Sequence, residues 1–212
     1  MKKALLLVSI LSISVFSTAC INNFAVQELN NKAKTSIEQG DYQSAIERLK
    51  SSIDLDDSIF ESHYNLAVAY TQAEDYVNAI ASYKKAIELK PDFADAYYSL
   101  AVAQESLATA IDAGEVEVTD DGQFAKAASI DTASDNAEEG ITVENKLSEA
   151  ALNAKKGLLN DASSNYDKYL ELAPNADDAD AVNTKIKALE EKINNPAETV
   201  SADTPAPLLE VQ

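Results

Sequence analysis

The chain of 212 residues has one cysteine, Cys20, and one histidine, His63. A transition-metal site needs several such ligands, so these two residues cannot build one. Two acidic stretches, one from Asp54 and one around Gly122, begin like a calcium-binding loop, but both lack the glutamate at the twelfth position. A glycine-rich phosphate loop and a Gly-x-Ser-x-Gly motif are also missing. We therefore predict no catalytic residues, no metal and no cofactor, and we predict that the protein is not an enzyme.

Cys20 is the residue whose position suggests chemistry. It follows a positive start, Lys2 and Lys3, and an apolar run over 4–16, which together have the pattern of a signal peptide. The run is shorter than the about 20 apolar residues that a transmembrane helix needs. A thiol at this place can form a thioether to a diacylglycerol, and two or more lipid chains anchor a protein stably.

Residues 17–20, Ser-Thr-Ala-Cys, resemble the bacterial lipoprotein signal, in which a small residue precedes a cysteine that is lipidated and becomes the new N-terminus. The resemblance implies a lipoprotein signal peptide over 1–19, a lipidated linker over 20–25 and lipidation at Cys20. It also implies an exported protein that is anchored by lipid to the cell membrane or the outer membrane. The alternative is an ordinary secretory signal that happens to contain a cysteine.

The charge of the chain restricts its partners. Loss of Lys2 and Lys3 with the signal would leave 15 of the 17 basic residues against 36 acidic ones, which takes the net charge from −19 to −21. Binding to nucleic acid or adhesion to anionic lipid relies on Lys and Arg, so we expect neither. The acidity either steers a basic partner to the protein or only keeps the protein soluble.

Helical patterns in the sequence repeat with a period of 34 residues. In the best copy, over 60–93, apolar residues spaced three and four apart predict one helix, and the pattern restarts after Asp75 for a second. Asp75 is the expected N-cap of the second helix, and Pro91 stops it. Stacked repeats of this length bury their apolar faces against neighbouring units. The residues in phase are Tyr42 with Tyr76, Ala45 with Ala79, Ile46 with Ile80, Ile53 with Ile87, and Ala33 with Ala67 and Ala101.

This unit resembles a tetratricopeptide repeat (TPR). The resemblance implies an all-α fold: a short α-solenoid of antiparallel helix pairs, with about three units and a C-terminal capping helix. His63 stands where the family prefers Trp, so we expect it to have a structural role in helix packing. The residues at the family's signature positions are His63, Leu66, Ala67, Tyr70, Ala79, Tyr83, Ala86 and Pro91.

The third copy loses the pattern after Gln104. A second-helix pattern returns beyond Gly157, which we expect at a turn, so either the third repeat is interrupted or a fourth follows a decayed third. In between, a mobile acidic loop is favoured over a short hairpin, because an isolated hairpin is marginal in water. The predicted TPR domain covers 26–193, with repeats at 26–59, 60–93 and 94–108 joined to 143–174, an insertion at 109–142, a capping helix at 177–193 and a disordered tail at 194–212.

The resemblance also implies a concave groove lined by the first helix of each repeat. Its predicted peptide-binding residues form an apolar strip with polar neighbours, and only Lys34 is basic among the eighteen groove positions. An extended segment that is partly apolar and neutral or basic therefore fits the groove better than an acidic tail does. The predicted site residues are Tyr64, Asn65, Val68, Gln72, Tyr98 and Val102.

These patterns together favour a lipid-anchored protein–protein interaction module, a scaffold or assembly factor of the bacterial cell envelope. The expected partner is another envelope protein or a peptide segment of one. The alternative is a solute-binding or accessory lipoprotein of an envelope transport system. That class normally has two α/β lobes, and the chain shows no strand–helix alternation.

Overall fold

The structure is a computed structural model that describes residues 23–119, 121–127 and 147–194. The predicted signal peptide, the lipidation site Cys20 and the predicted tail from 195 onward lie outside the described residues. Of the predicted acidic insertion at 109–142, residue 120 and residues 128–142 lie outside them as well. Among the described helices, none is both long and apolar enough to cross a membrane.

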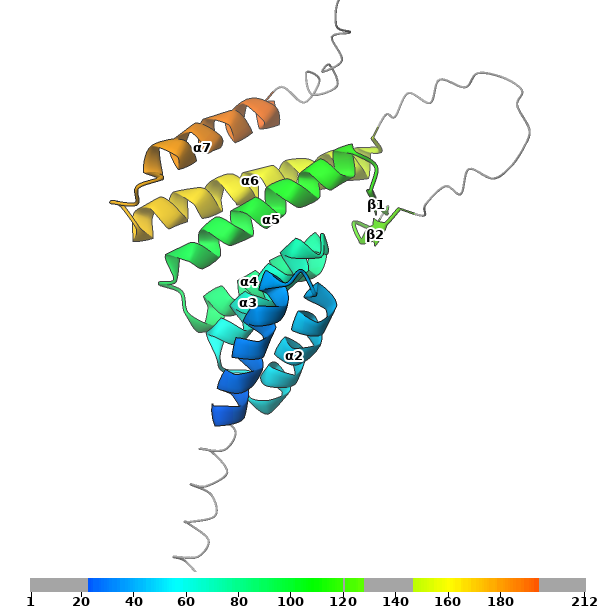
Figure 1. Cartoon of the computed structure of the whole chain (residues 1–212). Coiled ribbons are helices and arrows are strands. Elements are labelled where there is room, and N and C mark those ends of the chain that lie inside the picture. Colours follow the sequence, from blue (N-terminus) through cyan, green and yellow to red (C-terminus); the bar gives the residue numbers. More distant parts are fainter. Residues whose placement is uncertain (1–22, 120, 128–146, 195–212) are drawn as a thin grey trace, which may run out of the picture.

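Helices in antiparallel pairs make up the fold, so the predicted all-α solenoid is confirmed (Figure 1). Each helix packs mainly against its neighbours in the chain, as expected for a stack of repeats. The helices are the segment 23–38, α2 (Tyr42–Leu55), α3 (Phe60–Gln72), α4 (Tyr76–Leu89), α5 (Ala94–Asp112), α6 (Glu149–Leu172) and α7 (Ala179–Asn194).

The starts of α2 and α4 have the predicted kind of cap. Asp75 Oδ1 accepts a hydrogen bond from the backbone N–H of Asn78 at 3.3 Å, which confirms Asp75 as an N-cap. Asp41, which is in phase with it, accepts one from Ser44 at 3.1 Å. One residue before each cap the backbone is left-handed, at Gly40 with φ 77° and at Glu74 with φ 60°. The same turn therefore joins both helix pairs, with glycine in one and glutamate in the other.

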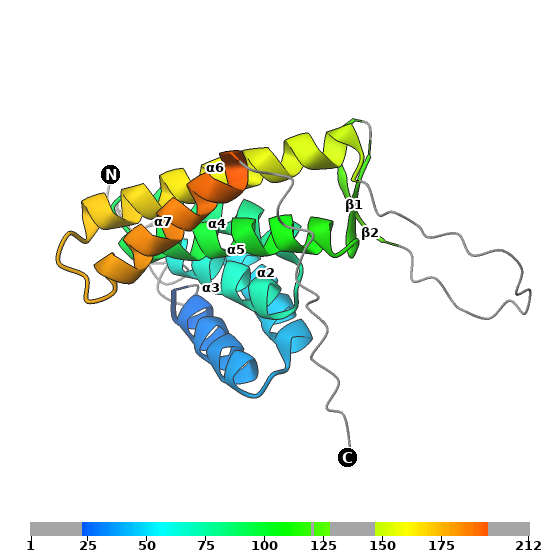
Figure 2. The same ribbon diagram turned by 90° about the horizontal axis from the view of Figure 1, so that it is seen from above.

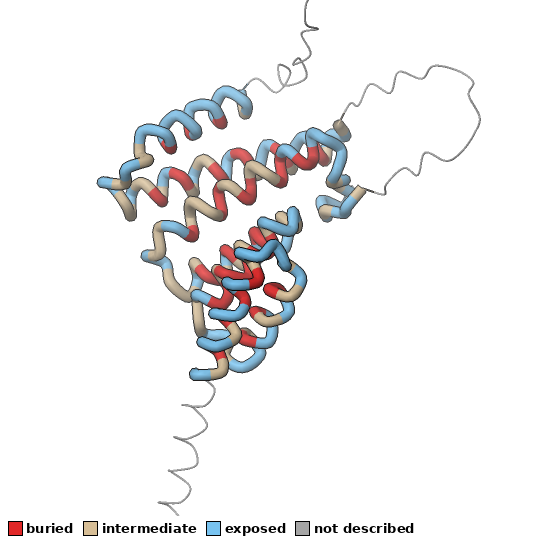
Figure 3. The backbone as a smooth tube through the Cα atoms, viewed as in Figure 1, coloured by how far each residue is buried: buried red, intermediate tan, exposed pale blue. Residues whose placement is uncertain are grey.

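Alanines let the helices of each pair approach closely. Ala33, Ala67 and Ala101, which are in phase in the sequence, are all 0% exposed, and so is Ala79. Larger residues fill the space around them, among them Tyr83, which is 2% exposed. The buried residues gather where helices face one another (Figure 3). They form one apolar cluster that extends from the first helix to α6 and a second among α5, α6 and α7.

Helix α6 runs without interruption through Gly157, so the turn predicted there is wrong. The helix begins after Ser148, whose Oγ accepts from the N–H of Ala151 at 3.1 Å, and it packs antiparallel against the long helix α5 (Figures 1 and 2). Glycine in a helix interior destabilises the helix by about 1 kcal/mol relative to alanine. Burial of the apolar face of α6, before and after Gly157 along the helix, outweighs this cost. That face consists of Ala151, Lys155, Leu159, Ala162, Tyr166 and Tyr169.

A short hairpin follows α5, where the sequence favoured a mobile loop. Strands β1 (Val116–Val118) and β2 (Phe124–Lys126) are antiparallel, with Val118 opposite Phe124. The expectation was wrong here because the hairpin is not isolated. Val116, Val118 and Phe124 pack against the first apolar cluster, and β1 contacts both α5 and α6. The repeat boundaries that the sequence predicts, including the interrupted third repeat, stay a prediction.

Candidate peptide-binding surface

The predicted site residues lie on two first helices, α3 and α5. Gln72 is exposed, whereas Tyr64, Val68, Tyr98 and Val102 are half-buried and Asn65 is buried. Their assignment to a binding groove stays a prediction. The structure shows what each side chain contacts within the chain, and this sets how much of it a partner could reach.

Tyr64 connects three helices. Its ring packs edge-to-face on Tyr83 of α4 at 5.6 Å and on Phe93, just before α5, at 5.0 Å. Its hydroxyl lies 3.3 Å from Ser99 Oγ of α5. Burial raises the pKa of the neighbouring Tyr83 to about 12, while a hydrogen bond from Thr71 acts in the opposite direction. Much of the Tyr64 ring therefore serves the packing of the second unit on the third.

Tyr98 does the same between α5 and α6. Its ring centroid is 5.5 Å from that of Tyr166 and 5.3 Å from that of Tyr169, both in edge-to-face geometry. The Tyr169 hydroxyl donates to Asp178 Oδ1 at 2.7 Å, and this carboxylate is the main reason why the pKa of Tyr169 is raised to about 12. The aromatic group thus ties α5 to α6 and to the turn before α7.

Asn65 belongs to a buried polar network that was not predicted. Its Nδ2 donates to Asn30 Oδ1 at 3.2 Å. Asn30 Nδ2 lies 2.8 Å from the hydroxyl oxygens of both Ser52 and Ser62 and 3.0 Å from the carbonyl oxygen of Val26. The network joins the first helix, α2 and α3 in the core. Its sequence signal was Ser52, which stands where the family pattern has alanine.

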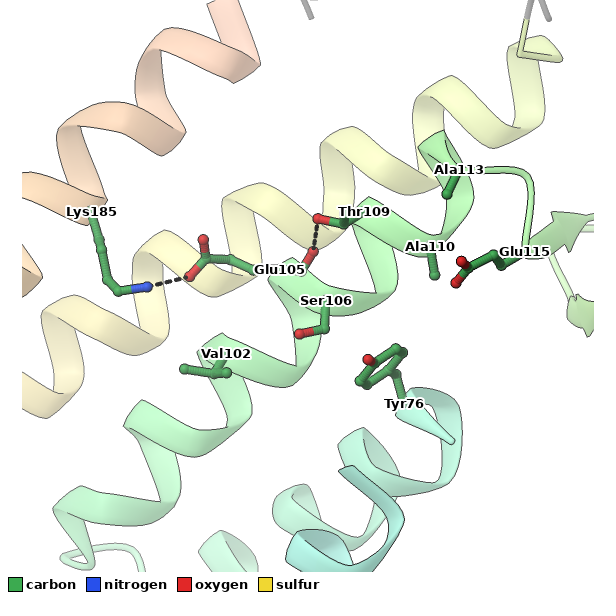
Figure 4. Close-up of a pocket in the computed structure, with 9 residues that line it drawn as sticks. All are labelled: Tyr76, Val102, Glu105, Ser106, Thr109, Ala110, Ala113, Glu115 and Lys185. Atoms are coloured by element: carbon green, nitrogen blue, oxygen red, sulfur yellow. Dashed lines mark hydrogen bonds and ion pairs between the residues drawn. The ribbon is translucent and has the colours of Figure 1, made fainter. Parts of the chain in front are cut away.

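Val102 lines an open pocket of about 340 Å³ on the side of α5 (Figure 4). Tyr76 of α4 and Ser106 of α5 face each other across it. Burial raises the pKa of Tyr76, and the carboxylates of Glu74 and Glu115 add to this effect. The pocket therefore combines an apolar wall, hydroxyl groups and negative charge, which suits recognition of a peptide by its backbone and by a neutral or basic side chain.

Glu105 and Lys185 close the other side of that pocket. Lys185 Nζ lies 3.6 Å from Glu105 Oε1 and 5.6 Å from the centre of the Tyr166 ring, and the Tyr166 hydroxyl donates to the same Glu105 oxygen. Burial raises the pKa of Tyr166, and the Glu105 carboxylate adds to this effect. Lys185 comes from α7, 80 residues along the chain from Glu105. The sequence predicted the helix that carries it but gave no sign of this contact.

His63 has the structural position expected of it. The ring is 8% exposed, and Nε2 lies 2.9 Å from the backbone oxygen of Asp57, which holds the loop before α3. Within the part of the chain that the structure describes, no group of three or more His, Cys, Asp or Glu side chains is placed to hold a metal ion.

One family model matches a part of the chain. Residues 69–107 match the model of the TPR repeat. A search of curated proteins gives no match.

Solved structures with a similar fold cover about four fifths of the chain. The first TPR domain of the human RPAP3 protein is 19% identical, with 80% of this chain and 95% of that one covered and a TM-score of 0.54. The second TPR domain of that protein, in complex with the HSP70 peptide SGPTIEEVD, is 18% identical over 78% and 98% of the two chains, with a TM-score of 0.52. The type III secretion translocator chaperone SycD of Yersinia enterocolitica is 14% identical over 80% and 86%, with a TM-score of 0.52.

The predicted likeness to TPR proteins is therefore confirmed for the repeat and for the fold. The lipoprotein signal is a separate prediction, and it falls on residues outside the described part of the chain. TPR domains are typically interaction modules without catalysis. The chain has the fold of a TPR domain, with a TPR repeat matched at residues 69–107.

Proposed function

We propose that the chain is a lipid-anchored TPR module of the bacterial cell envelope, which binds a peptide segment of another envelope protein on the surface of α3 and α5. The binding proposal depends on a surface that includes exposed Gln72 and half-buried Val68 on α3 and the pocket beside Val102 on α5. This surface offers apolar contact next to hydrogen-bonding groups, the combination that peptide grooves use.

The charge of this surface selects the kind of peptide. Peptide-bound neighbours with this fold hold segments that end in Glu-Glu-Val-Asp, from HSP90 in one case and from HSP70 in another. Here the predicted groove positions include Glu61, Asp95 and Glu105, and Lys34 is the only base among them. Lys185 of α7 lies beside the surface and is paired with Glu105. An acidic tail would meet like charges, so we propose a partner segment that is partly apolar and neutral or basic.

The anchor is proposed from the sequence alone. Cys20 is the single cysteine and follows an apolar run and a small residue. A lipid on Cys20 would hold the protein at a membrane, where its partners are envelope proteins, while the net negative charge would keep the body away from anionic lipid. Replacement of Cys20 by Ala tests this in cell fractionation. The variant should leave the membrane fraction, and a variant that stays there would overturn the anchor.

Partner capture with paired variants tests the binding surface. Tyr64 and Tyr98 are poor choices because both rings hold helices together. The double variant Gln72→Glu, Val102→Glu instead adds charge to the proposed surface, and Gln43→Glu on α2 adds a charge at another exposed glutamine. We expect the double variant to lose more than tenfold in captured partner, because central groove contacts carry much of the binding energy. Equal capture by the double variant and the Gln43 variant, with equal helicity, would refute the assignment.

A further inference from the structure

The end of α7 crosses the first half of α6 (Figure 2). Residues of both helices line a cavity of about 190 Å³. It shares no lining residue with the proposed peptide surface. Leu152, Leu159 and Ile193 give it an apolar lining, and Leu152 is 40% exposed. A large apolar side chain that is this open, beside a cavity, is a place where another apolar segment can bind.

Three lysines surround the cavity, and none of its lining residues is acidic. In a chain with a net charge of −19 this is a local excess of positive charge. Lys155 is already satisfied, because its Nζ lies 2.7 Å from Asp112 Oδ2 and its side chain is 8% exposed. Lys156 and Lys192 are exposed at the rim. The cavity therefore suits an apolar segment that carries at least one carboxylate.

We propose that residues 208–211 of the same chain, Leu-Leu-Glu-Val, bind in this cavity. Leu208, Leu209 and Val211 match its apolar lining, and Glu210 matches the two exposed lysines. The described helix α7 ends at Asn194, directly after the lining residues Lys192 and Ile193. The segment 195–207 between them can span about 40 Å when extended, and the cavity lies directly beside the end of α7 because Lys192 and Ile193 line it.

Attachment in the same chain makes a weak site sufficient. A short linker gives an effective concentration in the millimolar range, so a segment with only millimolar affinity is bound for much of the time. The bound segment would cover Leu152 at the open side of α6 and α7. Covering an exposed apolar side chain lowers the tendency of a chain to associate with other chains.

Paramagnetic relaxation in the full chain tests the proposal. In a chain with Cys20→Ser and Gln212→Cys, the new thiol directly after the segment carries a spin label, and the amide signals are observed by NMR. We expect the signals of Leu152, Lys156 and Ile193 to lose at least half of their intensity, while those of α2 stay unchanged. The added change Lys156→Glu, Lys192→Glu should restore the intensity, and Lys187→Glu, an exposed lysine of α7 that does not line the cavity, should leave the loss in place.

Several outcomes would overturn the proposal. They are an even loss over the whole surface, no loss, or a loss centred on α3 and α5, which would place the segment on the peptide surface instead. A mixed sample distinguishes a second copy. One population carries the spin label and no isotope, and the other carries the isotope and no spin label. If the same signals of the isotope-labelled chains broaden, the segment binds between chains, and the proposed binding within one chain is wrong.

Discussion

The buried network around Asn30 gives the sharpest prediction for stability. Replacement of Asn30 by Ala removes the partner of the Asn65 amide and the contacts to Ser52 and Ser62. Each neutral hydrogen bond contributes about 1 kcal/mol net, and a buried donor that is left without a partner costs about 1–3 kcal/mol. We expect Asn30→Ala to lower the free energy of unfolding by about 3 kcal/mol.

Ser52→Ala is the matched control. It restores the residue that the family pattern has at this position, and Asn30 keeps Ser62 and the Val26 carbonyl oxygen as partners. Because no buried group loses its last partner, the expected cost is about 1 kcal/mol or less.

Urea unfolding followed by circular dichroism at 222 nm separates the two variants. With a urea dependence of about 2 kcal/mol per molar, the midpoint should fall by about 1.5 M for Asn30→Ala and by at most about 0.5 M for Ser52→Ala. Equal shifts, or a shift below about 0.5 M for Asn30→Ala, would refute the reasoning.

Three further predictions follow from the geometry. Glu74→Gly should stabilise the protein by about 0.5–1 kcal/mol, because glycine adopts a left-handed φ without strain, and Gly40→Glu should destabilise it. Urea unfolding measures both variants, and a lower free energy of unfolding for Glu74→Gly would contradict the left-handed turn. Burial raises the pKa of Tyr83 to about 12 from 10.0, so Tyr83 loses its proton at lower pH in the unfolded chain than in the folded one. The free energy of unfolding should therefore fall as pH rises from about 10 to 12. Tyr83→Phe should make this fall smaller, and an equal fall in the variant would contradict the burial of Tyr83. Phe124→Ala should speed hydrogen exchange in β1 and at the end of α5 while α2 stays unchanged, and unchanged exchange at β1 would show that the hairpin does not depend on its packing.

The repeat itself could be predicted because it depends on local rules. A 34-residue period, small residues at helix contacts and an acidic N-cap at Asp75 each follow from the chain near them, and the structure has all three. Gly157 was misread for the opposite reason. Its local preference is for a turn, but the helix is maintained by contacts with α5, which is more than 40 residues away in the sequence.

For the candidate site residues, the sequence predicted the helices that carry them but not how deeply each side chain is buried. The repeat pattern places Gln72 and Val102 on α3 and α5, and the structure leaves them exposed and half-buried. The repeat pattern cannot show that Asn65 donates a hydrogen bond to Asn30 in the core, or that Lys185 of α7 lies beside Glu105, because both contacts join residues far apart in the chain. Such contacts depend on how units stack, which a period does not specify.

The proposal that α3 and α5 hold a peptide is tested most directly by photo-crosslinking in cells. A photoreactive residue replaces Gln72 in one variant and Gln43 in a second variant. Both glutamines are exposed, and only Gln72 lies on the proposed surface. The proposal predicts one dominant crosslinked envelope protein from position 72, attached through a partly apolar, neutral or basic segment, and none of it from position 43. The same product from both positions, or a strongly acidic segment at position 72, would contradict it.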